Sequence, residues 1–152
     1  MTQISISEPR TRFHQRGENL VNLEQVNLLR VQPLSEPELE LTKPLFGRDF
    51  VAGFSEGSSH WCLMKRDAIQ SLEFCSRSDA PDSKIVWSRK AIGETLSGFD
   101  FPAECSISFY DSKIGSLRVF IQGVFRGFLV ADQQRPLAIP ISTISSITFI
   151  SH

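Results

Sequence analysis

The chain has 152 residues, 41% of them hydrophobic and 22% charged, with a formal net charge of −1 at pH 7. Such a composition belongs to a folded globular protein, and the length suits one ordinary domain or two very small ones. The near-zero net charge excludes the global basic field by which many nucleic-acid-binding and membrane-surface proteins attract their partners.

Cysteine usage indicates the compartment. Cys62, Cys75 and Cys105 are an odd number without a CxxC spacing, and two of them lie inside apolar runs, where a thiol behaves as a small hydrophobic side chain. This usage favours a reducing environment over a secreted disulfide scaffold. The sequence has neither a membrane-spanning apolar run nor a signal peptide, so we expect a cytoplasmic protein without membrane association.

Residues 1–24 are predicted to be a polar tail that ends in a short helix. Basic side chains surround Phe13, which is typical either of an arm that touches phosphate or of a loosely ordered tail; flanking glutamates favour the tail. Apolar residues from Leu20 to Val26 allow one or two helical turns, and a strand is expected to begin near Leu28.

Residues 25–75 are expected to form a first small β unit. Gly47–Asp49 is typical of a turn, and a polar hairpin loop separates the predicted strands Phe50–Phe54 and His60–Met64. The next four residues suit a single 3-10 turn before a last strand, Ile69–Phe74.

Residues 76–102 are expected to be a linker. Its first part is polar and rich in turn formers. Ile92 and Leu96 then lie one helical turn apart, which predicts a short helix that ends before Pro102.

Residues 103–152 are expected to form a second β unit, because apolar and polar residues alternate strictly in three runs. The odd-numbered residues of these runs are predicted to face the core: Cys105, Ile107, Phe109, Leu117, Val119, Ile121, Leu137, Ile139 and Ile141. Pro140 cannot donate to a strand ladder, so its strand must lie at a sheet edge or end there.

The two β units echo each other at a constant offset of 75 residues. The coinciding residues are Phe50 and Phe125, Ile69 and Ile144, Ser71 and Ser146, and Phe74 and Phe149. Five short strands with a tight connector before the last one are the plan of an SH3-like or Sm-like barrel. We therefore expect a mainly-β fold of two tandem barrels joined by a linker with a short helix. Because such small barrels bury little surface, they should pack on each other or dimerise.

Three runs, residues 47–53, 61–69 and 137–144, resemble a group of small uncharacterised actinobacterial proteins. Members of that group carry two barrel-like copies joined through a short helix, so the resemblance implies the same architecture over roughly residues 38–150. This chain has Lys65 where the pattern would place a proline in the first copy. The resemblance implies no activity.

The residue types offer no catalytic or metal-binding motif. The histidines, His14, His60 and His152, are scattered without ligand spacing. His60 and Cys62 share one face of a strand, but no third group completes a nucleophilic site, so Cys62 is more simply a core residue. We therefore expect a protein that is not an enzyme and that needs no cofactor.

Binding remains, in two forms. The large aromatic side chains, Trp61 and Trp87 among them, exceed what two small cores need, which favours a protein-interaction or scaffold module and includes self-association. The alternative is weak binding of single-stranded RNA by the second barrel through interleaved basic and aromatic residues, namely Arg118, Phe125, Arg126, Phe128 and Arg135. An ordinary strand with phenylalanine inside and arginine outside would give the same sequence.

The two halves differ in charge. Residues 38–75 hold four basic and six acidic side chains, whereas residues 105–152 hold four basic and two acidic ones. This asymmetry would let the two halves, or two chains, attract each other, and it is also within ordinary surface variation.

Overall fold

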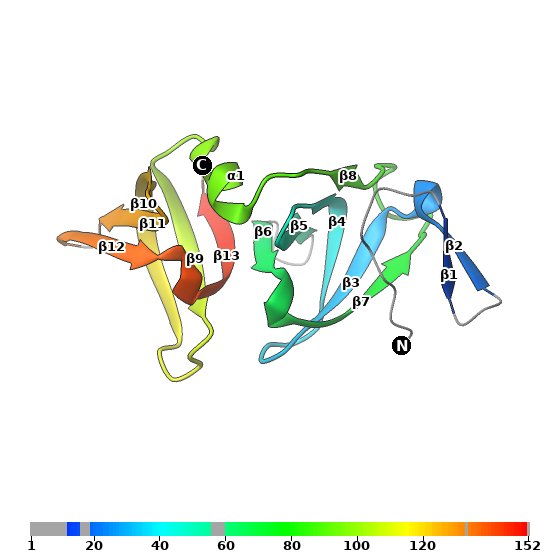
Figure 1. Ribbon diagram of the computed structural model, residues 1–152, viewed down its shortest axis with the longest axis horizontal. Coiled ribbons are helices and arrows are strands. Elements are labelled where there is room, and N and C mark those ends of the chain that lie inside the picture. Colours follow the sequence, from blue (N-terminus) through cyan, green and yellow to red (C-terminus); the bar gives the residue numbers. More distant parts are fainter. Residues whose placement is uncertain (1–11, 16–18, 56–59, 133, 152) are drawn as a thin grey trace.

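The computed structural model describes residues 12–15, 19–55, 60–132 and 134–151, and these residues form a mainly-β fold, as the sequence predicts (Figure 1). The first elements are β1 (Arg12–Gln15), β2 (Asn19–Asn22), η1 (Leu23–Gln25), β3 (Leu28–Pro33), β4 (Leu39–Phe46), β5 (Phe50–Ser55), β6 (His60–Lys65), η2 (Arg66–Ala68) and β7 (Ile69–Cys75). The elements that follow are β8 (Val86–Trp87), α1 (Ile92–Ser97), β9 (Ala103–Phe109), β10 (Ser116–Phe125), β11 (Phe128–Asp132), β12 (Pro136–Pro140), η3 (Ile141–Thr143) and β13 (Ile144–Ser151). The symbol η denotes a 3-10 turn.

One continuous sheet contains all the described strands except β1 and β2, which form a separate two-stranded sheet. Its strand order is β12-β11-β10-β9-β13-β6-β5-β4-β3-β7, with antiparallel neighbours throughout, and β8 adds to β4 in parallel. We refer to β3–β7 as the first half and to β9–β13 as the second half. The ladder between β6 and β13 joins them.

The segment predicted as tail and short helix differs from expectation where it is described. β1 and β2 pair as an antiparallel hairpin, and the helical part shrinks to the single 3-10 turn η1. Pairing satisfies the backbone groups of this segment without a helix, which explains why a weak helical signal did not prevail. The phosphate-arm alternative concerns residues that lie largely outside the described ranges.

Both halves follow the same order of pairing. In each half the last strand follows a 3-10 turn and pairs with the first strand, giving β7 on β3 and β13 on β9. A register shift interrupts both ladders next to the 3-10 turn, opposite Pro33 in one and Phe109 in the other. Just beyond it, the Leu34 N–H donates to the Ala68 carbonyl at 3.0 Å, and the Tyr110 N–H donates to a carbonyl of η3 at 3.1 Å.

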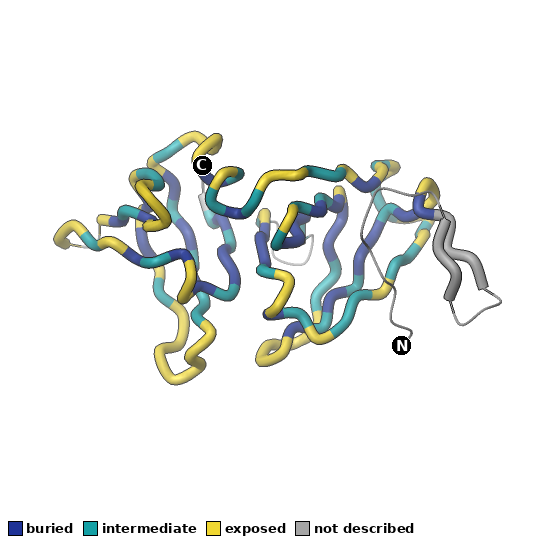
Figure 2. The backbone as a smooth tube through the Cα atoms, viewed as in Figure 1, coloured by how far each residue is buried: buried dark blue, intermediate teal, exposed yellow. Residues whose placement is uncertain are grey.

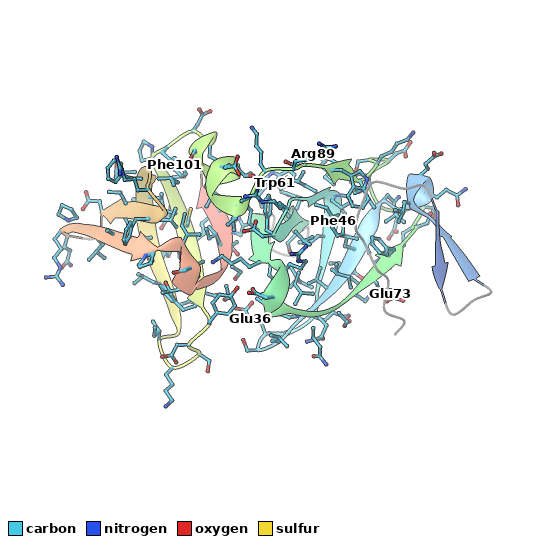
Figure 3. All side chains as sticks on the ribbon, viewed as in Figure 1. Glu36, Phe46, Trp61, Glu73, Arg89 and Phe101 are labelled. Atoms are coloured by element: carbon cyan, nitrogen blue, oxygen red, sulfur yellow. The ribbon has the colours of Figure 1, made fainter. Side chains whose placement is uncertain are left out.

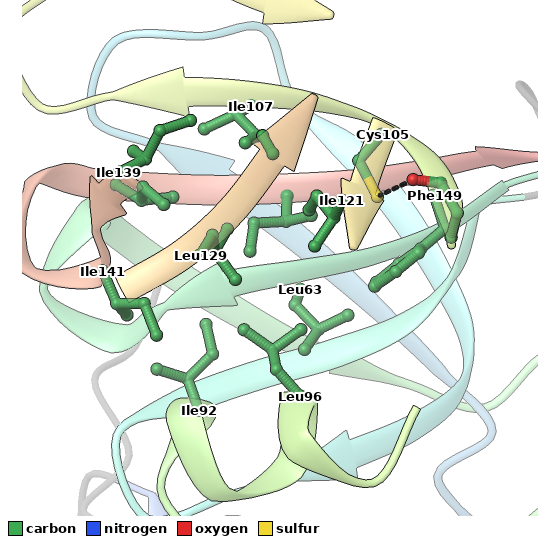
Figure 4. Close-up of a cluster of buried hydrophobic side chains, with 14 of the residues drawn as sticks. Leu63, Ile92, Leu96, Cys105, Ile107, Ile121, Leu129, Ile139, Ile141 and Phe149 are labelled. Carbon is green, nitrogen blue, oxygen red and sulfur yellow. Dashed lines mark hydrogen bonds between the residues drawn. The ribbon is translucent and has the colours of Figure 1, made fainter. Parts of the chain in front are cut away.

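Buried residues occur in both halves of the chain (Figure 2), and they form two hydrophobic cores on opposite faces of this sheet. The first core consists of Leu23, Val26, Leu29, Val31, Leu41, Phe46, Val51, Cys62, Met64, Ala68 and Ile85. The second core consists of Phe50, Ala52, Leu63, Ile92, Leu96, Ala103, Cys105, Ile107, Val119, Ile121, Leu129, Ala131, Ile139, Ile141, Ile144, Ile147 and Phe149, part of which Figure 4 shows. Successive residues of β5 and β6 therefore face different cores, so both strands are buried on both faces.

The core predictions for the second half are confirmed. Six of the nine odd-numbered residues predicted to face inward are buried, and Phe109, Leu117 and Leu137 pack against the second core while partly exposed. β12, which carries Pro140, lies at one end of the sheet, as its missing N–H requires. The predicted 3-10 turn after His60–Met64 is η2.

The linker is held to both halves. Ile92 and Leu96 of α1, the predicted short helix, are buried in the second core. On the other side, Trp87 of β8 packs on Phe46, with ring centroids 5.1 Å apart. The linker therefore contributes to both cores instead of spanning open solvent.

Candidate interaction surface

Three phenylalanines project outward from the β10–β11 hairpin. Phe125 lies directly opposite Phe128, and Phe120 lies opposite Asp132; residues that face each other across a ladder project to the same side. The intervening partners Ile121 and Ala131 are fully buried on the other side. Phe125 is 64% exposed, Phe120 51% and Phe128 39%.

β12 continues this surface. Across the β11–β12 ladder, Phe128 lies opposite Pro140, and Val130 lies opposite Ala138. We call the resulting surface the outer face, made up of Phe120, Phe125, Phe128, Val130, Pro136, Ala138 and Pro140. Apart from the exposed Asp132, which lies between Phe120 and Pro136, this surface is apolar, and a protein rarely exposes large apolar side chains together without a use for them.

A tight turn presents the aromatic end of the outer face. Arg126 and Gly127 alone connect β10 to β11, with φ values of 48° and 82°. Two positive φ values suit the two-residue hairpin turn that matches strand twist, and the glycine meets this demand without strain. The Arg126 guanidinium lies over the Phe125 ring, 5.8 Å from its centroid. The turn thus places a cation directly beside an exposed aromatic ring.

A bulge separates Phe120 from the hairpin end. The β10–β11 register shifts between Ile121 and Gly123, so Gln122 is the extra residue. A Cβ at Gly123 would meet nothing within 4 Å, so the surface between the two aromatic positions is open. Bulges of this kind redirect a strand and its side chains.

The structure does not bring all the predicted binding residues together. Arg118 forms an ion pair with Glu104 at 2.7 Å and is seven residues from Phe125, about 20 Å along an extended strand. Arg135 lies in the β11–β12 turn, at the opposite end of the hairpin from Arg126. Only Phe125, Arg126 and Phe128 form a compact group.

The two tryptophans belong elsewhere. Trp61, labelled in Figure 3, belongs to β6. It lies opposite Phe149 in the ladder between the halves and packs edge-on against Phe54, with ring centroids 5.9 Å apart. It is only partly covered, whereas Trp87 packs against the first core. Both side chains therefore help to hold the chain together and lie apart from the Arg126 turn.

Phe120 is a surface residue that was not among the predicted binding residues. The sequence does predict its exposure, because the alternation that places the odd-numbered residues of this strand inward places Phe120 outward.

Polar contacts between the halves gather at the two 3-10 turns. The Lys65 ammonium donates to the Ile141 carbonyl and lies 5.6 Å from the centroid of the Tyr110 ring. The Tyr110 hydroxyl donates to the Asp67 carboxylate. Burial lowers the pKa of Lys65, and burial together with the Asp67 carboxylate raises the pKa of Tyr110. These contacts give the junction a defined register.

The thiols have little nucleophilic character at neutral pH. Burial raises the pKa of Cys62 to about 11 and that of Cys105 to about 12, so both stay protonated. Within the described ranges no three or more His, Cys, Asp or Glu side chains gather as a metal site would require.

Comparisons of the chain with protein-family models, with curated proteins and with solved structures found no match. Across the part of the chain that the structure describes, no helix combines the length and apolar character that a membrane crossing demands. The structure therefore defines a mainly-β protein with an exposed aromatic face, and the resemblance to the actinobacterial group stays a prediction.

Proposed function

We propose that this chain is a cytoplasmic, non-catalytic protein-interaction module, built from two tandem SH3-like or Sm-like barrels, and that it binds its partner through the outer face. The strand orders β7-β3-β4-β5-β6 and β13-β9-β10-β11-β12 support the barrel assignment, because each places the fifth strand of a unit beside its first. The matching register shifts opposite Pro33 and Phe109 support two copies of one unit.

The exposure of Phe125 carries the functional proposal. Burying a phenylalanine side chain contributes about 1.5–3 kcal/mol, so leaving three of them in water is unfavourable for an isolated chain. The centre of a protein interface is rich in aromatic residues and arginine, and the Phe125–Phe128 turn with Arg126 has that composition.

A site-specific photo-cross-linker tests this proposal. We would replace Phe125 by a photoreactive phenylalanine analogue in the full chain and irradiate cells that produce it. Ile114 is the matched control, because it is 58% exposed in the β9–β10 turn, away from the outer face. We expect protein adducts at position 125 and few at position 114. Absence of adducts at 125, or equal yields at both positions, would refute the proposal.

The second candidate function is binding of single-stranded RNA at the same turn. Arg126 beside the exposed Phe125 ring supports it, because bases stack on aromatic rings while arginine contacts phosphate. Fluorescence anisotropy with a single-stranded RNA pool, at low and at physiological salt, measures this directly. Salt-sensitive binding that Arg126→Glu abolishes would favour RNA, whereas no binding at low salt would remove this candidate.

A further inference from the structure

The ladder that joins the halves leaves one edge without a neighbour, among the described residues, on each of two matching strands. β6, the strand before η2, pairs with β13, the strand after η3. The corresponding strands of the opposite halves are β12, which precedes η3, and β7, which follows η2. These two strands are the ends of the sheet within the described residues. The sheet of one chain therefore ends in the same two kinds of strand edge that pair with each other in the β6–β13 ladder.

The outer face corresponds to a surface that is buried in the first half. Phe50 lies opposite Lys65, the residue before η2, and Phe128 lies opposite Pro140, the residue before η3. Phe128, and not Phe125 as the 75-residue offset suggests, thus holds the ladder position of Phe50. The offset fails here because the β11–β12 hairpin is shorter than the β5–β6 hairpin. Phe50 is 1% exposed because the second core covers it.

The same contrast holds one step further along both ladders. Ala52 and Leu63 lie opposite each other and are buried in the second core, whereas Ala138, opposite Val130, is exposed. In the first half this surface is covered by the second half of the same chain. In the second half the corresponding surface lacks a cover among the described residues.

We propose that a second copy of this chain covers the outer face, with its β7 paired to β12 of the first copy in the register of the β6–β13 ladder. This inference rests on the proposed function and names the partner. In that register Leu72 of one copy lies opposite Ala138 of the other, as Ile147 lies opposite Leu63 within the chain.

The partial exposure of side chains on β7 supports a second copy of the chain as the partner. Ile147 and Phe149 of β13, which pairs on both sides, are buried, whereas Leu72 and Phe74 at the corresponding positions of β7 are only partly buried. Pairing with β12 would cover them. The two halves also carry formal charge of opposite sign, with five basic and seven acidic side chains over residues 28–75 and four basic and three acidic ones over residues 103–151, which favours contact between unlike halves.

The free edge of β12 offers more backbone hydrogen-bond acceptors than donors. The Ile141 N–H donates to the Gly127 carbonyl, so the even-numbered residues of β12 point their backbone groups away from β11. Of these, Pro136 and Pro140 offer carbonyls only, and Ala138 has the single N–H. Prolines at an edge block indiscriminate strand addition, and the remaining N–H fixes one register for a partner.

Such a contact is heterologous, because β12 of one copy meets β7 of the next. Repeated contacts of this kind generate a closed ring or an open filament according to the rotation between copies. The self-association is therefore expected to extend beyond a dimer as the concentration rises.

Sedimentation velocity of the purified full chain over a range of concentrations tests the proposal. We expect the sedimentation coefficient to rise with concentration, and we expect Ala138→Pro, which removes the last outward N–H of β12, to abolish that rise. Ala138→Val keeps the N–H and is the matched control. Circular dichroism establishes that both variants retain the β fold. A wild-type chain that stays monomeric at every concentration overturns the proposal.

A disulfide trap tests the register without relying on a variant that weakens binding. In a Cys75→Ser background, chains with Ala138→Cys are mixed with chains with Leu72→Cys and oxidised. We expect mixed dimers from this pair, and none when Leu34→Cys, at an exposed position beyond β3, replaces Leu72→Cys. Assembly with no mixed disulfide, and with no effect of Ala138→Pro, overturns the β12–β7 pairing.

These results separate from those of the proposed function. A monomeric chain whose position 125 cross-links to a different protein contradicts self-association and keeps the interaction module. Absence of any protein adduct at position 125 contradicts the module itself.

Discussion

The side chain of Asp49 holds the start of α1 from 43 residues away. Its Oδ1 accepts a hydrogen bond from the Ile92 N–H at 2.9 Å, so a carboxylate in the β4–β5 turn satisfies one of the free donors at the helix N-terminus. The linker is thereby fixed to the first half while Ile92 packs into the second core. A single contact thus couples the turn, the linker and the second half.

Removing this contact should weaken folding. We expect Asp49→Ala to lower the free energy of unfolding by about 1 kcal/mol, the usual effect of losing a side-chain acceptor at a helix start. Asp49→Asn keeps an oxygen acceptor and should lose less. Arg48→Ala removes only the exposed ion pair with Glu94 and should change little. Urea unfolding of the three variants measures this, and equal losses in all of them would contradict the role given to Asp49.

Gly53 marks a close approach of backbone within the first half. A Cβ at this position would lie 2.7 Å from the Leu41 Cβ and 2.9 Å from the Thr42 carbonyl oxygen. We expect Gly53→Ala to destabilise the fold by about 1–3 kcal/mol through overpacking. Gly123→Ala is the matched control in another strand, since its Cβ would meet open space. A thermal-shift comparison in which both variants behave alike would show that β4 and β5 are not so close.

The two halves should unfold together. Leu63 belongs to β6 of the first half, yet it is buried in the second core beside Ile147. We expect Leu63→Ala to cost about 2–5 kcal/mol and to lower a single unfolding transition as a whole. Leu34→Ala, at a side chain that is 62% exposed, should leave stability nearly unchanged. Two separate transitions in calorimetry would contradict a shared core.

Alkaline pH should destabilise the fold through its buried thiols. Burial raises the pKa of Cys62 from 9.0 to about 11, so the folded state keeps the proton that the unfolded state loses above about pH 9. The stability from this group is therefore complete below pH 9 and declines as the pH rises toward 11. We expect Cys62→Ala to show a shallower decline over this range in urea unfolding under reducing conditions. An unchanged slope would mean that the thiol is accessible to water.

Local patterns in the sequence determined much of the fold. Alternation fixed which residues of β9 and β10 face the core, because side chains alternate strictly along a strand, and it holds for Ile107 and Ile121. The connector length predicted η2, and the missing N–H of Pro140 predicted a strand that lies at a sheet edge or ends there; β12 does both. Each of these features depends only on neighbouring residues.

The tertiary structure alone decided that the outer face of the second half is exposed and that the corresponding surface of the first half is buried. Phe50 and Phe128 are the same residue type at the same ladder position, yet one is buried and the other exposed. The difference arises because the β6–β13 ladder brings the second half over the first, and no local pattern specifies a pairing between strands about 80 residues apart. Burial on a second face depends on what another part of the chain covers. The sequence named Phe125, Arg126 and Phe128 as candidates, but only the folded chain shows that they lie together and that both phenylalanines are exposed.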